Sequence, residues 1–254
     1  MKRTDIIFAL LAVVPTLARA QTEPIKVCTH VNAGFFTRDT GGVPTGLEAD
    51  LLTRFAASTN AALTFQDDPS FEAVLANTEA GRCQIGASTV TLTEARKSRF
   101  LFSQPYFPNR VVVVQKNTSA FAQPSDLKGH RVAVVKETLS VGFISAIPGV
   151  KSVLVKDDAA AFDALIKGEA DAVACDSAVV LHFLAKHPDL AMGFPIGDRS
   201  FFAFILPKDS KLLAPLDAYL KKLVPTPEFT RILAKHFGEA NAEFLASEIT
   251  SAKR

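Results

Sequence analysis

Short apolar runs alternate with stretches of helical periodicity through the first part of the chain. Residues 25–29 form a strand-like run, and Leu47, Leu51, Leu52 and Phe55 then follow at helical spacing. A second helix is expected over about 71–80, ended by Gly81, with a strand starting at Cys83. Strands that alternate with helices in this way predict a parallel sheet covered by helices.

A second series of the same kind follows. We expect strands at 111–114, 132–135 and 172–175, a loop with a short helix at 123–129, and helices starting near Ser140 and covering about 159–168. Residues 201–206 are extended and apolar, and two helices, about 211–223 and 227–237, close the chain. If these last helices pack on the first unit, the chain crosses twice between two lobes and a cleft lies between them. One continuous doubly wound sheet is the alternative.

The first residues have the pattern of a secretory signal peptide. Lys2 and Arg3 precede an apolar run over 6–17, and Ala18-Arg19-Ala20 supplies the small residues of a cleavage site. We expect cleavage after Ala20 and export to the periplasm, because the run is too short for a membrane anchor. Without residues 1–20, basic and acidic residues are equal in number. A neutral chain with no Lys/Arg run has little electrostatic drive toward nucleic acid, so no nucleic-acid partner is expected.

Export makes the three cysteines informative, because disulfides persist in oxidising compartments. Cys28 lies in the first strand-like run and Cys83 begins another, so the two could bridge if these strands are neighbours. Cys175 ends a third strand and would remain free. Three buried free thiols are the alternative.

Catalytic and metal-binding motifs are missing from the sequence. It contains no GxSxG, P-loop, GxGxxG, HExxH or CxxC pattern, and its histidines are scattered. We therefore expect no organic cofactor and no metal, and a hydrolase is disfavoured.

The most informative segment covers residues 89–106, directly after a strand. Thr91 and Thr93 offer hydroxyl groups, Thr93 can cap a short helix starting at Glu94, and Arg96 lies one turn into that helix. Taken alone, the segment is also compatible with a capped helix and a solvated arginine.

At this segment the chain resembles the family 3 periplasmic solute-binding proteins, which deliver polar amino acids to ABC transporters. The family shows a Thr, an Arg five positions later and a Phe-Ser-x-Pro-Tyr-like ending, which Thr91, Arg96 and residues 102–106 match. Residues 46–51, 126–129, 168–172 and 236–238 are further likenesses. The resemblance implies a two-lobed α/β fold, the type II periplasmic binding protein, in which each lobe is a mostly parallel sheet flanked by helices and two crossover strands form the hinge. Lobe 1 would comprise 21–108 plus 201–254, and lobe 2 would comprise 109–200.

The resemblance also implies a ligand site. Arg96 would clamp the α-carboxylate of the ligand with Thr91 adding a hydroxyl, since a guanidinium matches a carboxylate bidentately. Asp176 would bind the α-ammonium, or cap the helix that follows it. Further contacts are expected from Thr89, Thr138, Leu139, Phe71, His30 and Cys175. Phe71 is equally compatible with a core position.

Glu137 departs from the glycine that the family usually has in the loop over 136–140, where backbone N–H groups can hold a carboxylate. A carboxylate there should repel an anion unless it points away or meets Lys136.

By this resemblance the function is periplasmic binding of a small zwitterionic ligand, a polar amino acid, by lobe closure for delivery to an inner-membrane ABC permease. The protein would act as a monomer and would not be an enzyme. Two alternatives stay open. One is a sensory or dehydrogenase-associated binding protein, and the other is an enzyme similar to cyclohexadienyl dehydratases with Glu137 as its general acid.

Overall fold

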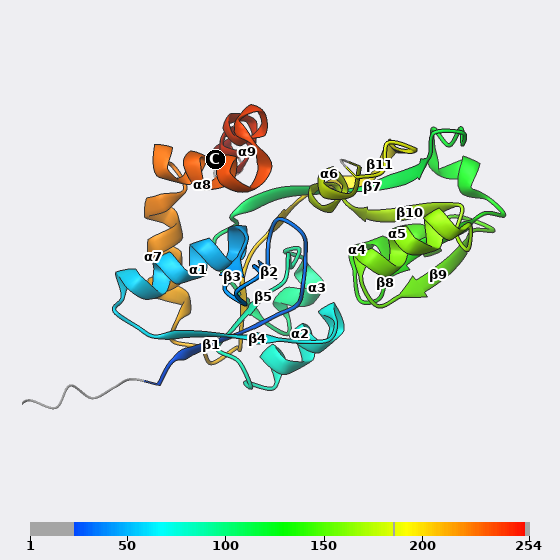
Figure 1. Cartoon of the computed structure of the whole chain (residues 1–254). Coiled ribbons are helices and arrows are strands. Elements are labelled where there is room, and N and C mark those ends of the chain that lie inside the picture. Colours follow the sequence, from blue (N-terminus) through cyan, green and yellow to red (C-terminus); the bar gives the residue numbers. More distant parts are fainter. Residues whose placement is uncertain (1–22, 185, 252–254) are drawn as a thin grey trace, which may run out of the picture.

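The structure is a computed structural model that describes residues 23–184 and 186–251. The predicted signal peptide at 1–20 lies outside the described residues. Two separate five-stranded sheets, each with its own helices, form two lobes (Figure 1). The two-lobed fold is therefore confirmed, and the alternative of one continuous sheet is wrong.

The sheet of the first lobe has the strand order β4-β1-β5-β12-β6. β1 pairs in parallel with β4 and β5, whereas β12 returns antiparallel to β5 and β6. A small hairpin, β2 with β3, precedes the first helix. The strands are β1 (Ile25–Thr29), β2 (Thr37–Arg38), β3 (Pro44–Thr45), β4 (Leu63–Asp67), β5 (Ile85–Ala87), β6 (Leu101–Phe102) and β12 (Ile205–Leu206); the helices are α1 (Leu47–Ser58), α2 (Phe71–Glu79), α3 (Glu94–Lys97), α7 (Leu213–Leu223), α8 (Pro227–Phe237) and α9 (Glu239–Ser251).

The sheet of the second lobe has the order β11-β7-β10-β8-β9. β8 pairs in parallel with β9 and β10, and β7 runs antiparallel to β10 and β11. Helices α4 to α6 and the 3₁₀ helix η1 complete the lobe. The elements are β7 (Phe107–Lys116), η1 (Pro124–Leu127), β8 (Arg131–Val135), α4 (Leu139–Ser145), β9 (Lys151–Val155), α5 (Asp158–Lys167), β10 (Ala172–Asp176), α6 (Ser177–Leu184) and β11 (Leu190–Phe202).

The connection between the lobes consists of β7 and β11, which run side by side from one lobe into the other (Figure 1). Each strand spans one of the lobe boundaries expected at 108/109 and 200/201. Phe107 and Phe202, at the lobe 1 ends of the two strands, pack in the large core of that lobe with Phe35 and Phe237. The crossing strands are thus anchored by aromatic burial at one end.

The end of the chain differs from the expectation, because a third helix, α9, follows the two predicted ones. Gly238 ends α8 with φ 84°, a value that favours glycine, and the chain then re-enters a helix at once. Ala242, Leu245 and Ile249 of α9 are buried in the lobe 1 core. The apolar stripe of α9 is narrow and its composition polar, so its helix is stabilised by this packing more than by a strong sequence pattern.

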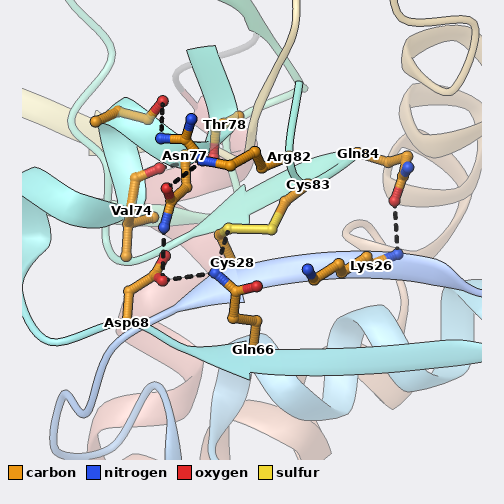
Figure 2. The surroundings of a disulfide bond; sticks show 11 residues. Lys26, Cys28, Gln66, Asp68, Val74, Asn77, Thr78, Arg82, Cys83 and Gln84 are labelled. Atoms are coloured by element: carbon orange, nitrogen blue, oxygen red, sulfur yellow. Dashed lines mark hydrogen bonds between the residues drawn. A yellow bond between two sulfur atoms is a disulfide. The ribbon is translucent and has the colours of Figure 1, made fainter. Parts of the chain in front are cut away.

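The Cys28–Cys83 disulfide is confirmed (Figure 2). Cys28 is in β1 and Cys83 lies just before the neighbouring strand β5, with 5.6 Å between their Cα atoms. Both are fully buried beside Val74 of α2. Around them, the Asp68 carboxylate accepts hydrogen bonds from Gln66 and Asn77, each 2.7 Å long (Figure 2). The alternative of three free thiols is wrong; Cys175 alone of the three is unpaired, and it is buried.

Replacing both Cys28 and Cys83 by Ser should lower the free energy of unfolding by about 4 kcal/mol, because the cross-link constrains a long loop in the unfolded chain. Urea unfolding followed by circular dichroism measures the change. Cys175→Ser is the control, since it leaves the loop closed. Equal unfolding midpoints for the double variant and the parent protein would contradict a stabilising role for the disulfide.

Candidate functional site

A cavity of about 30 Å³ lies between the lobes, at the carboxyl ends of β1 and β5 on one side and of β8 and β10 on the other. This volume accommodates about two water molecules. Every residue that the sequence analysis placed in the ligand site lines this cavity. The lining residues are His30, Asn32, Phe71, Thr89, Thr91 and Arg96 from lobe 1, and Val135, Thr138, Leu139, Ser140, Asp158, Ala174, Cys175 and Asp176 from lobe 2.

Arg96 bridges the two lobes. The Thr93 hydroxyl accepts from the Arg96 N–H and caps α3, which sets the helix so that Arg96 points into the gap. Its Nη1 donates to the Thr91 carbonyl at 3.1 Å within lobe 1, and its Nη2 donates to the Glu137 carbonyl at 2.5 Å in lobe 2. The side chain is only 8% exposed, and burial lowers its pKa while the Asp176 charge raises it. A buried cation therefore lines the cavity, where it can bind an anionic group of a ligand.

Phe71 lies at the start of α2, between Arg96 and His30. The Arg96 guanidinium sits over its ring, 5.2 Å from the centroid, in cation–π contact. The His30 ring meets it edge-on at 6.3 Å. Phe71 also packs in a small core cluster with Leu75 and Val90, so both interpretations of this residue hold in part.

His30 follows β1 and is nearly buried, with Nδ1 hydrogen-bonded to the Ser88 hydroxyl. Burial lowers its pKa to about 4, against the opposing effect of Asp157 and Asp68. The imidazole is thus neutral at physiological pH and contributes a polar but uncharged wall.

Thr89 is held in a left-handed conformation with φ 48°, which a β-branched residue rarely adopts. Its N–H donates to Glu48 Oε1 at 2.8 Å, and its hydroxyl accepts from the Asn32 amide at 3.0 Å. Glu48 is fully buried in α1, and the Tyr106 hydroxyl donates to the same carboxylate oxygen. The buried carboxylate therefore fixes the backbone that presents Thr89 to the cavity.

Glu48 reaches this position because α1 begins against the preceding loop. Gly46, with φ 116°, allows the Leu47 and Glu48 N–H groups to donate to the carbonyls of Gly34 and Phe35. A Cβ at Gly46 would lie 2.3 Å from the Phe35 carbonyl oxygen, so only glycine fits.

Asp176 ends β10, on the opposite wall from Arg96. The Asn109 amide donates to its Oδ1, and Asn109 comes from the crossing strand β7. Burial raises the Asp176 pKa to about 6, although the Asn109 hydrogen bond and the Arg96 charge lower it. Burial also raises the pKa of the neighbouring Cys175 thiol, which keeps the thiol protonated.

The loop over 136–140 differs from the expected anion-binding loop. The Thr138 hydroxyl donates to the Val135 carbonyl and does not cap α4. Glu137 takes a left-handed φ of 62° and contributes its backbone carbonyl to Arg96, while its side chain is exposed and does not line the cavity. The Glu137 carboxylate is therefore not part of the cavity wall, which is one of the possibilities left open by the sequence, although its charge opposes the lowering of the Arg96 pKa by burial. The carboxyl groups lining the cavity belong to Asp158 and Asp176.

Sequence reasoning missed Asn32, Val135, Ser140, Asp158 and Ala174, which also line the cavity. Val135 and Ala174 lie at or near the carboxyl ends of two predicted strands, β8 and β10, so they could have been included because these strand ends line the cleft. Asp158 follows β9, and only the strand order β10-β8-β9 brings the end of β9 to the same edge.

Among the described residues, no three His, Cys, Asp or Glu side chains are grouped as a metal site. A search of the same residues finds no helix with the length and apolar character needed to cross a bilayer.

The comparisons with known proteins agree with this geometry. The model of the family "Bacterial extracellular solute-binding proteins, family 3" matches residues 25–239, so the chain belongs to this family. A probable histidine-binding protein from Neisseria gonorrhoeae is 26% identical over 219 residues, which cover 83% of this chain and 81% of that protein. The solved structure of the arginine-, lysine-, histidine-binding protein ArtJ from Geobacillus stearothermophilus has a TM-score of 0.78 and 26% identity, covering 85% of this chain and 96% of that one.

Two relatives are named as an enzyme, the membrane-bound lytic murein transglycosylase F. The membrane-bound lytic murein transglycosylase F of Desulfosudis oleivorans is 26% identical over 223 residues, which cover 84% of this chain but 48% of that protein. The chain thus matches about half of the larger protein, whereas it matches the histidine-binding relative over most of its length.

Glu48→Gln should remove a pH dependence of stability. Burial raises the Glu48 pKa from 4.5 to about 7, so between these values the folded protein binds more protons than the unfolded chain. The free energy of unfolding of the parent protein should therefore fall as pH rises from about 4.5 through 7, and glutamine abolishes this contribution. Urea titrations at pH 5 and pH 8 measure the slope for both proteins. Glu79→Gln, a surface change on α2, is the control; identical slopes for parent and Glu48→Gln would refute the assignment.

Proposed function

We propose that the protein binds one zwitterionic amino acid in the cavity between its lobes and delivers it to an ABC permease of the inner membrane. The observation that carries the proposal is that Arg96 from lobe 1 and Asp176 from lobe 2 lie on facing walls of one cavity. Arg96 would take the α-carboxylate and Asp176 the α-ammonium. Family membership and relatives named for amino-acid binding support the same assignment.

The contacts of Arg96 suggest how a ligand would be accepted. One guanidinium nitrogen donates to the Glu137 carbonyl, a neutral acceptor on the other lobe. A ligand carboxylate would replace that carbonyl with a charged acceptor, and charge-assisted hydrogen bonds are about twice as strong as neutral ones. Because the cavity holds about two water molecules, an amino acid can be admitted only if the lobes separate and then close around it. Contacts from both lobes would then favour the closed state.

The protein would act in the periplasm, as a binding protein and not as an enzyme. The Cys28–Cys83 disulfide fits an oxidising compartment, in line with export by residues 1–20 and release into the periplasm as a monomer. We assign a binding and not a catalytic role, because Glu137, the candidate general acid, is exposed and is not among the residues that line the cavity.

Arg96→Ala should weaken binding of the best amino-acid ligand by at least about thirtyfold, because it leaves the ligand carboxylate buried without its partner. Isothermal titration calorimetry with each of the proteinogenic amino acids identifies the ligand and measures the loss. Arg99→Ala is the matched control, since Arg99 lies on the surface paired with Glu79. Unchanged affinity in Arg96→Ala, or no amino acid bound by the parent protein, would refute the proposal.

A further inference from the structure

Asp158 is a carboxylate of the cavity wall that the binding of a zwitterion does not use. It is the first residue of α5, yet the helix cap is supplied by Asp157, whose side chain accepts from the Ala160 N–H at 2.8 Å. Asp157 also lies 3.6 Å from the Lys156 ammonium. Within the described part of the chain, the Asp158 side chain makes no hydrogen bond or ion pair, so neither capping nor pairing explains its position in the cavity.

The charges around the cavity are unbalanced. The lining residues include one permanent cation, Arg96, and two carboxyl groups, Asp158 and Asp176, while His30 is neutral. A zwitterion brings one charge of each sign, so it leaves the imbalance of one negative charge in place. Burial, and after it the negative charges of Asp176 and Asp157, raise the pKa of Asp158 to about 7. A cation beside Asp158 would remove this electrostatic cost.

Asn32 adds a second acceptor from the opposite lobe. Its amide nitrogen donates to the Thr89 hydroxyl, but its Oδ1 is buried with no partner among the described residues, and the residue is 5% exposed. Buried acceptors that lack a donor are costly in a folded protein. Asp158 and Asn32 therefore offer unused acceptors on both walls of the same cavity, and the matching ligand group is a donor.

The strand order separates the two carboxyl groups. Asp176 ends β10, whereas Asp158 follows β9, and β8 lies between these two strands, whose axes are therefore two strand spacings, about 10 Å, apart. This separation suits two different positive groups of one small molecule, an α-ammonium and a charge at the end of a side chain.

We propose that Asp158 and Asn32 form a side-chain subsite for a positive group, so that the ligand is an L-α-amino acid with a permanently cationic side chain. This inference rests on the proposed function, because Arg96 and Asp176 must hold the backbone of the ligand. Asp158 is then a specificity-determining residue, supplied by lobe 2 and completed by an acceptor from lobe 1 on closure.

The test compares ligands of similar shape and different charge by isothermal titration calorimetry at pH 7.5. L-arginine is compared with L-citrulline, its neutral analogue, and L-lysine with L-norleucine. At least one cationic member should bind at least about thirtyfold more tightly than its neutral partner. Asp158→Asn should reduce this preference to a few-fold by weakening the cationic ligand, while Asp163→Asn, which removes an exposed charge from the same helix, should leave it unchanged.

The outcomes separate this inference from the proposed function. If a neutral or acidic amino acid binds most tightly and depends on Arg96, or if Asp158→Asn leaves the charge preference intact, the subsite is refuted and the proposed function stands. If no amino acid binds the parent protein, both are refuted. Circular dichroism checks that the Asp158→Asn variant is folded. Where the parent protein binds L-citrulline or L-norleucine, unchanged affinity of the variant for the same ligand is a second, independent check of its fold.

Discussion

The arrangement of the lobes depends on the hydrogen bonds of the Arg96 guanidinium, which join one lobe to the other. The guanidinium is a buried cation whose donors are divided between a carbonyl of its own lobe and the Glu137 carbonyl of the other, with the Phe71 ring beneath it. Burying a cation is unfavourable unless it is well hydrogen-bonded and faces opposite charge. Asp176 supplies that charge from across the gap without contacting Arg96 in an ion pair within 4.0 Å. The site is therefore built to receive a group that completes both charges at once.

The wall that presents this cation is stiffened by buried polar contacts. Glu48, fully enclosed in lobe 1, accepts from the Thr89 N–H and from the Tyr106 hydroxyl, and Thr89 in turn accepts from Asn32. Holding Thr89 in the left-handed region costs free energy, which must be offset by these hydrogen bonds and the surrounding core. Because the core of α1 positions Glu48, helix packing far from the gap determines the shape of the cavity wall.

The sequence predicted the parts of the site that depend on local pattern. Thr93 caps α3 as predicted, and Arg96 in that helix and Asp176 at the end of a predicted strand both line the cavity. Asp158 was missed because no strand was predicted over β9, so nothing in the sequence analysis placed the residues after β9 beside the end of β8. The sequence left the position of the Glu137 carboxylate open, because it depends on a left-handed backbone that gives the Glu137 carbonyl to Arg96, and residue type alone does not specify such a dihedral angle. Helix α9 lacks a strong apolar stripe and owes its stability to tertiary burial.

The two strands that connect the lobes determine how the lobes can move relative to each other when a ligand binds. β7 and β11 are paired strands, and their pairing is irregular between Met192 and Pro195 and again between Ile196 and Ser200. Such irregularities interrupt the ladder and bend strands locally, whereas the lobe 1 ends of both strands are anchored in the aromatic core. Arg199 of β11 pairs with Glu248 of α9 at 2.8 Å, which ties the crossing strand to the C-terminal helix. A ligand can favour closure only through contacts that both lobes make, and Arg96 on one wall of the cavity with Asp176 and Asp158 on the other are placed to make them.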